Sequence, residues 1–182
     1  MHLDQLGVQV CFTIAALALG VLVFILAMKQ RKKDAQGSGK RLWEAAEADL
    51  SLEVQALCAE FGGNEQVLNW ENPLFDLCTP LMVAVAWDKV ECARILANTR
   101  GVDCNRATKG VGWTALFLAA FNAHHECVKV LLTVKGIELN KSPVAGICKG
   151  KSPLQIAREN PSGKDATVCA QIVQLLQDAG AT

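Results

Sequence analysis

The chain has 182 residues, 51% of them hydrophobic, and a formal net charge of zero at pH 7. This length allows one ordinary domain or a small domain with an attachment segment, and the balanced charge gives no sign of a nucleic-acid partner, which usually requires a basic surface. Its eight cysteines form no C-x-x-C pair and no disulfide framework, so they exclude a small secreted scaffold and indicate reduced thiols of a cytosolic domain.

The first predicted element is a transmembrane helix over residues 8–28. From Val8 to Met28 the sequence reads VQVCFTIAALALGVLVFILAM, and a helix of this length covers about 30 Å, enough to cross a bilayer core. A signal peptide and a buried core helix are the alternatives. No Lys or Arg precedes the run and no cleavage pattern follows it, which disfavours the signal peptide. Ala16 and Gly20 form a small-xxx-small pair that would permit a weak homodimer.

A basic juxtamembrane linker over residues 29–39 follows. Its basic cluster lies directly after the apolar run and consists of Lys29, Arg31, Lys32 and Lys33. By the positive-inside rule, this cluster puts the following residues in the cytosol and leaves residues 1–7 as a short extracytosolic N-terminus. The cluster either binds anionic lipid as well or only sets topology. The polar, glycine-containing stretch Asp34–Gly39 is typical of a short joint between domains.

Residues 40–182 contain an internal repeat. Similar segments start at Thr79 (TPLMVA), Thr114 (TALFLA) and Ser152 (SPLQIA), 35 and 38 residues apart, and a fainter copy starts at Leu42. A hydroxyl residue at the start is a helix cap, and Pro after it suits the first helical position. A second helix with apolar residues at helical spacing follows each start. A glycine ends three of these second helices (Gly101, Gly136 and Gly180).

This pattern resembles the ankyrin-repeat family, whose repeat reads G-x-T-P-L-H-x-A-A-x-x-G-H-x-x-V-V-x-L-L-L. The best copy runs from Gly112 to Leu132 as GWTALFLAAFNAHHECVKVLL. The resemblance implies an all-α solenoid of about four repeats, near residues 40–72, 73–105, 106–140 and 145–182. The family's TPLH histidine is replaced by Met82, Phe117 and Gln155, so its hydrogen bonds between repeats are expected to be missing.

The resemblance also implies a protein–protein interaction scaffold or adaptor, not an enzyme, that binds a partner in a concave groove and needs no cofactor. Carried over by register, the expected partner-binding residues are Phe75, Asp76, Trp87, Val111, Trp113, Phe121, Asn122, Lys149 and Lys151. Trp87, Trp113 and Phe121 are of the type that anchors interfaces, unless the fold buries them.

The expected partner is a protein that is itself membrane-associated, because a joint of about ten residues reaches at most about 35 Å. The alternative function is that of a regulatory subunit of a membrane complex, acting mainly through its transmembrane helix.

Two further motifs are better explained by the repeat register than by chemistry. The loop Ala145–Ser152 loosely matches a phosphate-binding P-loop, but no strand precedes it and Ser152 already starts a repeat helix. His124, His125, Glu126 and Cys127 are consecutive, so on a helix they point in different directions and cannot converge on a metal. We therefore expect no nucleotide, metal or other cofactor.

Overall fold

The computed structural model describes residues 29–30, 34–160 and 163–182. The predicted transmembrane helix over 8–28, with Ala16 and Gly20, lies outside the described residues, as do residues 1–7 and the basic side chains of Arg31, Lys32 and Lys33. Within the described part of the chain, no helix has both the length and the apolar character that a membrane span requires.

The chain divides into two compact units, Met1–Gly37 and Ser38–Thr182. In the first unit the described residues 29, 30 and 34–37 are helical, and Lys29 is exposed. The second unit contains the repeats, and the rest of the architecture concerns it alone.

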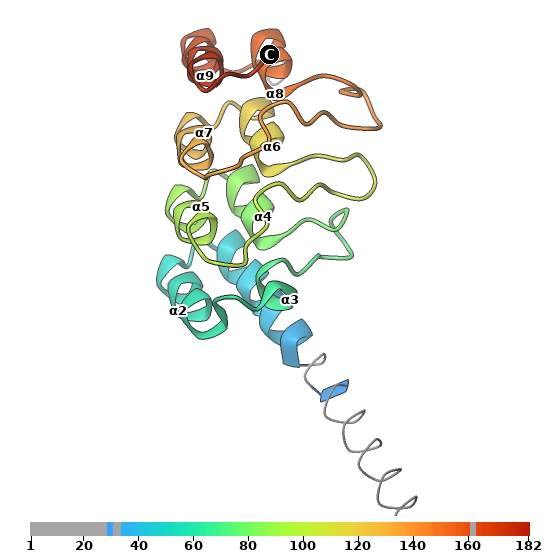
Figure 1. Ribbon diagram of the computed structural model, residues 1–182, viewed down its shortest axis with the longest axis vertical. Coiled ribbons are helices and arrows are strands. Elements are labelled where there is room, and N and C mark those ends of the chain that lie inside the picture. The colour runs from blue at the N-terminus through green and yellow to red at the C-terminus, as the bar shows by residue number, and fades with distance from the viewer. Residues whose placement is uncertain (1–28, 31–33, 161–162) are drawn as a thin grey trace, which may run out of the picture. The chain divides into compact units, whose positions relative to one another are not determined.

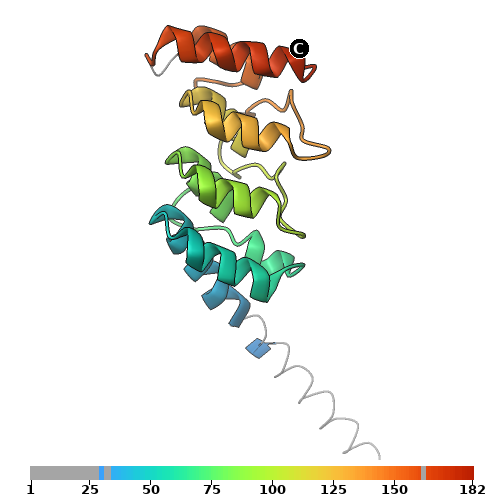
Figure 2. The ribbon, with the colours of Figure 1, turned by 90° about the vertical axis from the view of Figure 1, so that its left-hand side faces the viewer.

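The second unit is a stack of paired helices in two layers (Figures 1 and 2). It begins with the helical segment 38–47, followed by α2 (Ser51–Phe61), α3 (Glu65–Leu68), α4 (Pro80–Ala86), α5 (Val90–Ala97), α6 (Ala115–Phe121), α7 (His125–Leu132), α8 (Pro153–Glu159) and α9 (Ala166–Asp178). Helices α2, α5, α7 and α9 pack in series as one layer, while α4, α6 and α8 form the other. Isolated bridges Asn72–Cys78 and Ala107–Thr114 give two of the connecting loops a hairpin-like base. The predicted all-α fold is confirmed for these residues.

The first helix of each of the last three pairs starts at the residue that the sequence predicts. Thr79 Oγ1 accepts a hydrogen bond from the Met82 N–H (3.3 Å), and Thr114 Oγ1 accepts one from the Phe117 N–H (3.2 Å). Ser152 forms a capping box with Gln155, in which each side chain accepts from the other residue's backbone N–H. These caps satisfy N–H groups that lack a partner within the helix.

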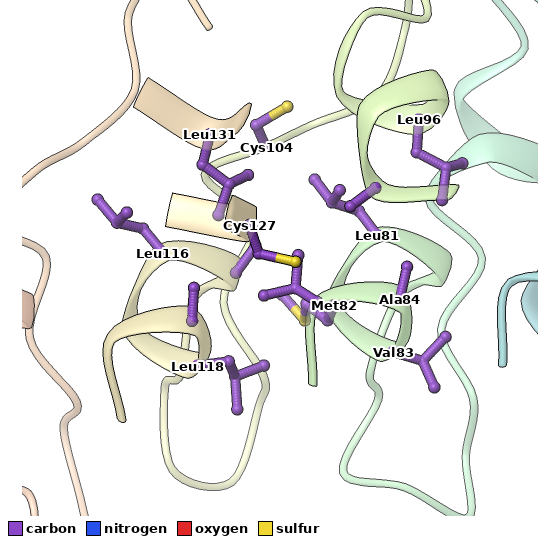
Figure 3. Packing of buried hydrophobic residues seen from close by; sticks show 14 of the residues in the cluster. Leu81, Met82, Val83, Ala84, Leu96, Cys104, Leu116, Leu118, Cys127 and Leu131 are labelled. Atoms are coloured by element: carbon purple, nitrogen blue, oxygen red, sulfur yellow. The ribbon is translucent and has the colours of Figure 1, made fainter. Parts of the chain in front are cut away.

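The apolar residues that replace the TPLH histidine are part of the core. Met82 is 1% exposed and Phe117 is fully buried. Figure 3 shows Met82 between α4 and α6, near Leu81 of its own helix and Cys127 of the next pair. Burial of such a side chain stabilises a fold by about 1.5–3 kcal/mol. Adjacent repeats are therefore held together by apolar packing at this position.

Residues 34–39, where the sequence predicts a polar, glycine-containing joint, are helical. Gly39 lies against Trp70, and a Cβ added at Gly39 would come within 2.4 Å of the Trp70 Cβ. The glycine at this position therefore serves close packing between a helix and a loop rather than flexibility.

An asparagine ladder joins each loop to the next repeat. Asn69 Nδ2 donates to the Gly101 carbonyl oxygen (2.7 Å), and its Oδ1 accepts from the Asp103 N–H (2.7 Å). Asn105 repeats both bonds to Gly136 (2.9 Å) and Glu138 (2.8 Å). In the last step, Asn140 Oδ1 accepts from the Thr182 N–H (2.9 Å).

The outer surface of the last repeat is polar. Gln171, Gln174 and Gln177 are exposed on α9, while Ile172 and Leu176 face the core. A polar outer face is what a terminal repeat needs, because no further repeat covers it.

Candidate functional site

A cavity of about 570 Å³ lies where the helical segment 38–47, α4 and α6 meet the loops before α4 and α6. We call it the groove. It is lined by Trp43, Glu47, Phe75, Asp76, Cys78, Val83, Ala86, Trp87, Thr108, Val111, Trp113, Leu118 and Asn122. The first three helix pairs contribute to it, so it exists only because the repeats stack.

Aromatic side chains form much of the groove wall. The Trp43 and Phe75 rings are stacked, with centroids 5.2 Å apart. Trp113 stacks on Phe117 and Phe121, with centroids 6.0 and 5.7 Å away. Trp87 is 63% exposed and Phe75 is 55% exposed. Large exposed aromatic side chains beside a cavity are typical of a binding surface.

The charged residues of the groove are both acidic. Glu47 is half-buried, and no Lys or Arg is among the lining residues. The Asp76 carboxylate accepts hydrogen bonds from the backbone N–H groups of Gly110 (2.8 Å) and Val111 (3.4 Å). These bonds fix the position of the Asp76 charge at the mouth of the groove.

The Cys78 thiol of the groove is not activated as a nucleophile, and two indole N–H groups of the groove lack hydrogen-bond partners among the described residues. Burial raises the pKa of the Cys78 thiol to about 12, which the Asp76 charge also favours, so the thiol stays protonated at neutral pH. The Trp43 indole lies near the Cys78 sulfur and acts to lower this pKa, although it forms no hydrogen bond with the sulfur. Trp43 Nε1 and Trp113 Nε1 are both buried without a hydrogen-bond partner among the described residues.

Six of the nine sequence-predicted site residues meet in the groove: Phe75, Asp76, Trp87, Val111, Trp113 and Asn122. Phe121 is not among the lining residues and instead stacks on Trp113. Trp113 and Phe121 are half-buried rather than exposed. Lys149 and Lys151 lie on the later loop, away from the groove, and Lys151 pairs with Glu159, which raises the pKa of Lys151.

Sequence reasoning missed Trp43 and Glu47, because the first repeat is too degenerate to suggest groove residues. The sequence does contain a pattern that indicates Glu47 as a groove residue. Glu47 lies two residues before Asp49, just as Ala86 lies two residues before Asp88. Asp49 and Asp88 both have positive φ (61° and 55°) at the turn between paired helices. Aligning these turns places Glu47 at the position of Ala86, which lines the groove.

The two other motifs have structural roles. Ser152, at the end of the P-loop-like sequence, is the helix cap of α8. The His124 Nδ1 lies 2.8 Å from the Val85 carbonyl oxygen of the preceding repeat, and the Cys127 thiol donates to Asp88. No group of three His, Cys, Asp or Glu side chains converges as a metal site in the described part of the chain.

Two comparisons with known proteins agree with this architecture. A family model described as "Ankyrin repeats (3 copies)" matches residues 42–143 and 100–182. The chain is also 36% identical over 86 residues to inversin of Gallus gallus. That similarity covers 47% of this chain but 7% of inversin, so it concerns a small part of a much longer protein.

Proposed function

Because this chain belongs to the ankyrin-repeat family, we propose that it is a membrane-tethered adaptor that holds a protein partner in its groove. Ankyrin repeats are a protein–protein interaction module, and the repeats make up most of the chain. The partner-contacting residues in this proposal are the six predicted ones that line the groove, together with Trp43 and Glu47.

The observation that carries the proposal is the exposure of the large apolar side chains of Phe75 and Trp87 at the groove. Both rings are more than half exposed, although leaving a large apolar side chain in water forgoes about 1.5–3 kcal/mol of burial energy. Each lies at the edge of a preformed cavity that stacked helices hold in place. A partner that covers these rings would recover that energy, as at other aromatic-rich interfaces.

The membrane part of the proposal rests on sequence. The run Val8–Met28 is long and apolar enough to span a bilayer, and the basic residues after it favour a cytosolic position for the repeats. The partner would then be a membrane protein or one recruited to the same surface.

The test of the groove is affinity capture with the full-length chain in non-ionic detergent. Three forms are compared: the wild type, Trp87→Ala, and Leu52→Ala as a control. Leu52 is 82% exposed on α2 and is not among the groove residues, so both substitutions remove an exposed apolar side chain. We expect a partner retained by the wild type and by Leu52→Ala, but depleted roughly tenfold or more by Trp87→Ala. Equal capture by all three forms would show that the groove is not the binding surface.

The test of the tether is a chimera in which an unrelated transmembrane sequence replaces residues 8–28. An adaptor that acts through its groove keeps its partner in the chimera, whereas a subunit that acts through its transmembrane helix loses it. Carbonate extraction of membranes and protease protection of the repeats would show whether the chain spans a membrane and which side the repeats occupy.

A further inference from the structure

We propose that the groove is a receptor site for a cationic side chain, a lysine or arginine, of the partner. This inference rests on the proposed function and adds the chemistry of the occupant. The groove combines four aromatic side chains (Trp43, Phe75, Trp87 and Trp113) with two carboxylates, Glu47 and Asp76, and its lining includes no basic residue.

The aromatic faces favour a cation. A Lys ammonium or Arg guanidinium is attracted to the negative face of an aromatic ring, most strongly to tryptophan, and three of the four rings here are indoles. Trp87 is 63% exposed and stacks on no other ring among the described residues. Lysine and arginine also carry an aliphatic stem, which can lie along apolar walls such as Val83 and Leu118 while the charged end stays near the acids.

The two carboxylates disfavour a purely apolar occupant. Glu47 forms no ion pair or side-chain hydrogen bond with the rest of the described chain, and the Asp76 carboxylate is held by two backbone N–H groups. An apolar side chain that filled the groove would take water from both charges and give no counter-charge in return, which is unfavourable. A cationic side chain would also displace this water, but it would supply a positive charge to the two carboxylates.

Nearby basic side chains do not neutralise these carboxylates. Arg106 and Lys109 lie on the loop before α6, whose Gly110 and Val111 N–H groups bind Asp76, and both pair with Glu71. Arg106 contacts Glu71 Oε1 through two nitrogens (2.9 and 2.7 Å), and Lys109 Nζ lies 3.5 Å from Glu71 Oε2. The bases of this loop are therefore engaged with a carboxylate that is not part of the groove.

The experiment uses the four tryptophans of the chain as probes. Full-length protein is labelled with 5-fluorotryptophan in a non-ionic detergent, and the four ¹⁹F signals are assigned by single Trp→Phe substitutions. Trp43, Trp87 and Trp113 line the groove, whereas Trp70 packs on Gly39 and is an internal control. The ligands are n-butylammonium chloride, which is the end of a lysine side chain, and 1-butanol, which has the same carbon chain without charge. Sodium chloride keeps the ionic strength equal.

We expect butylammonium to shift the three groove signals saturably and to leave the Trp70 signal in place. Butanol should need a concentration higher by roughly two- to thirtyfold, the range that a cation–π contact supplies. Glu47→Gln should weaken butylammonium binding by a factor in the same range and leave butanol unchanged. Glu60→Gln, at an exposed position of α2 outside the groove, is the matched control and should have no effect.

Three results would overturn the inference: butanol that binds as well as butylammonium, an unchanged affinity in Glu47→Gln, or no shift of the groove signals with either ligand. The proposed function is judged separately by the Trp87→Ala capture experiment. Loss of the partner in that variant, together with equal binding of butanol and butylammonium, would establish a groove that takes an apolar anchor instead.

Discussion

The Cys127 sulfur lies 3.4 Å from Asp88 Oδ1 of the preceding repeat, and the thiol donates to that carboxylate. The same relationship occurs one repeat earlier, where Cys92 lies 3.6 Å from Asp49 Oδ1. Both aspartates occupy the left-handed turn between paired helices, at φ 55° and 61°, where the family pattern has glycine. Aspartate lacks the conformational freedom that glycine has at this turn, but its carboxylate accepts a hydrogen bond from the next repeat.

The first prediction concerns this turn. Asp88→Ala should lower the free energy of unfolding by about 1–2 kcal/mol, because alanine keeps the strained left-handed backbone and loses the thiol acceptor. Asp88→Gly should change it by less than about 0.5 kcal/mol, because relief of strain offsets the lost bond. Urea unfolding followed by circular dichroism measures both. As a control, Ala123→Gly, at φ 58° with no carboxylate to lose, should stabilise by about 0.5 kcal/mol.

The second prediction ranks the three asparagines of the ladder by how much stability each Asn→Ala substitution removes. Asn69→Ala should be the most destabilising change, by about 2–3 kcal/mol, because it removes two hydrogen bonds from a side chain that is only 7% exposed. Asn105→Ala removes two bonds at a half-buried site and should cost about 1–2 kcal/mol, and Asn140→Ala removes one and should cost less than about 1 kcal/mol. Denaturant midpoints give the order, and equal effects at all three positions would contradict it.

The third prediction concerns the contact between the loops at the groove. A Cβ added at Gly110 would lie 2.5 Å from Asp76 Oδ1, so Gly110→Ala must displace the Asp76 carboxylate from the backbone N–H groups that it binds. We expect a loss of about 1 kcal/mol in stability and faster hydrogen exchange of the Val111 amide. Gly37→Ala is the control, because a Cβ there meets no atom within 4 Å. An unchanged Val111 exchange rate would mean that the loops do not depend on this contact.

The fourth prediction is a loss of stability at high pH. Burial raises the pKa of Cys92 and Cys104 to about 11, and that of Cys127 to about 12, from an ordinary value of 9.0. A raised pKa keeps the folded thiols protonated where unfolded thiols ionise, so the stabilisation is complete below pH 9 and is lost as pH rises toward 11–12. Each thiol contributes a slope of up to about 1.4 kcal/mol per pH unit in that window.

The check is urea unfolding of the wild type and of Cys127→Ala between pH 8 and pH 11. The variant should be less stable at pH 8 but should lose stability less steeply above pH 9. The chain has no tyrosine, so phenol ionisation does not interfere. Parallel slopes for the two proteins would show that the Cys127 thiol is not protected.

The parts of the fold that depend on local chemistry were predictable from the sequence. Thr79, Thr114 and Ser152 cap their helices through bonds to residues three positions away, so the start signal lies within one short segment. Gly101, Gly136 and Gly180 follow their helices with positive φ, a conformation that favours glycine.

Other features depend on residues that are distant in the sequence. Gly39 lies in the predicted joint, but its environment depends on Trp70, which no local sequence pattern reveals. The repeat register predicts Phe121 as a groove residue, and in the structure its ring packs on Trp113 and Phe117. The direction of that ring depends on three-dimensional packing, whereas register alone specifies only the position of the backbone.

The stacking of helix pairs also determines which parts can melt first. Contacts of α9 run to α7 and α8, and those of α8 run to α6 and α9. In such a nearly one-dimensional array each repeat contacts only its neighbours, so the last repeat can open without direct loss of contacts in distant repeats. All groove residues lie between Trp43 and Asn122, so fraying of α8 and α9 would leave the recognition surface assembled. Opening of the helical segment 38–47 would have the opposite effect, because that segment carries Trp43 and Glu47 of the groove.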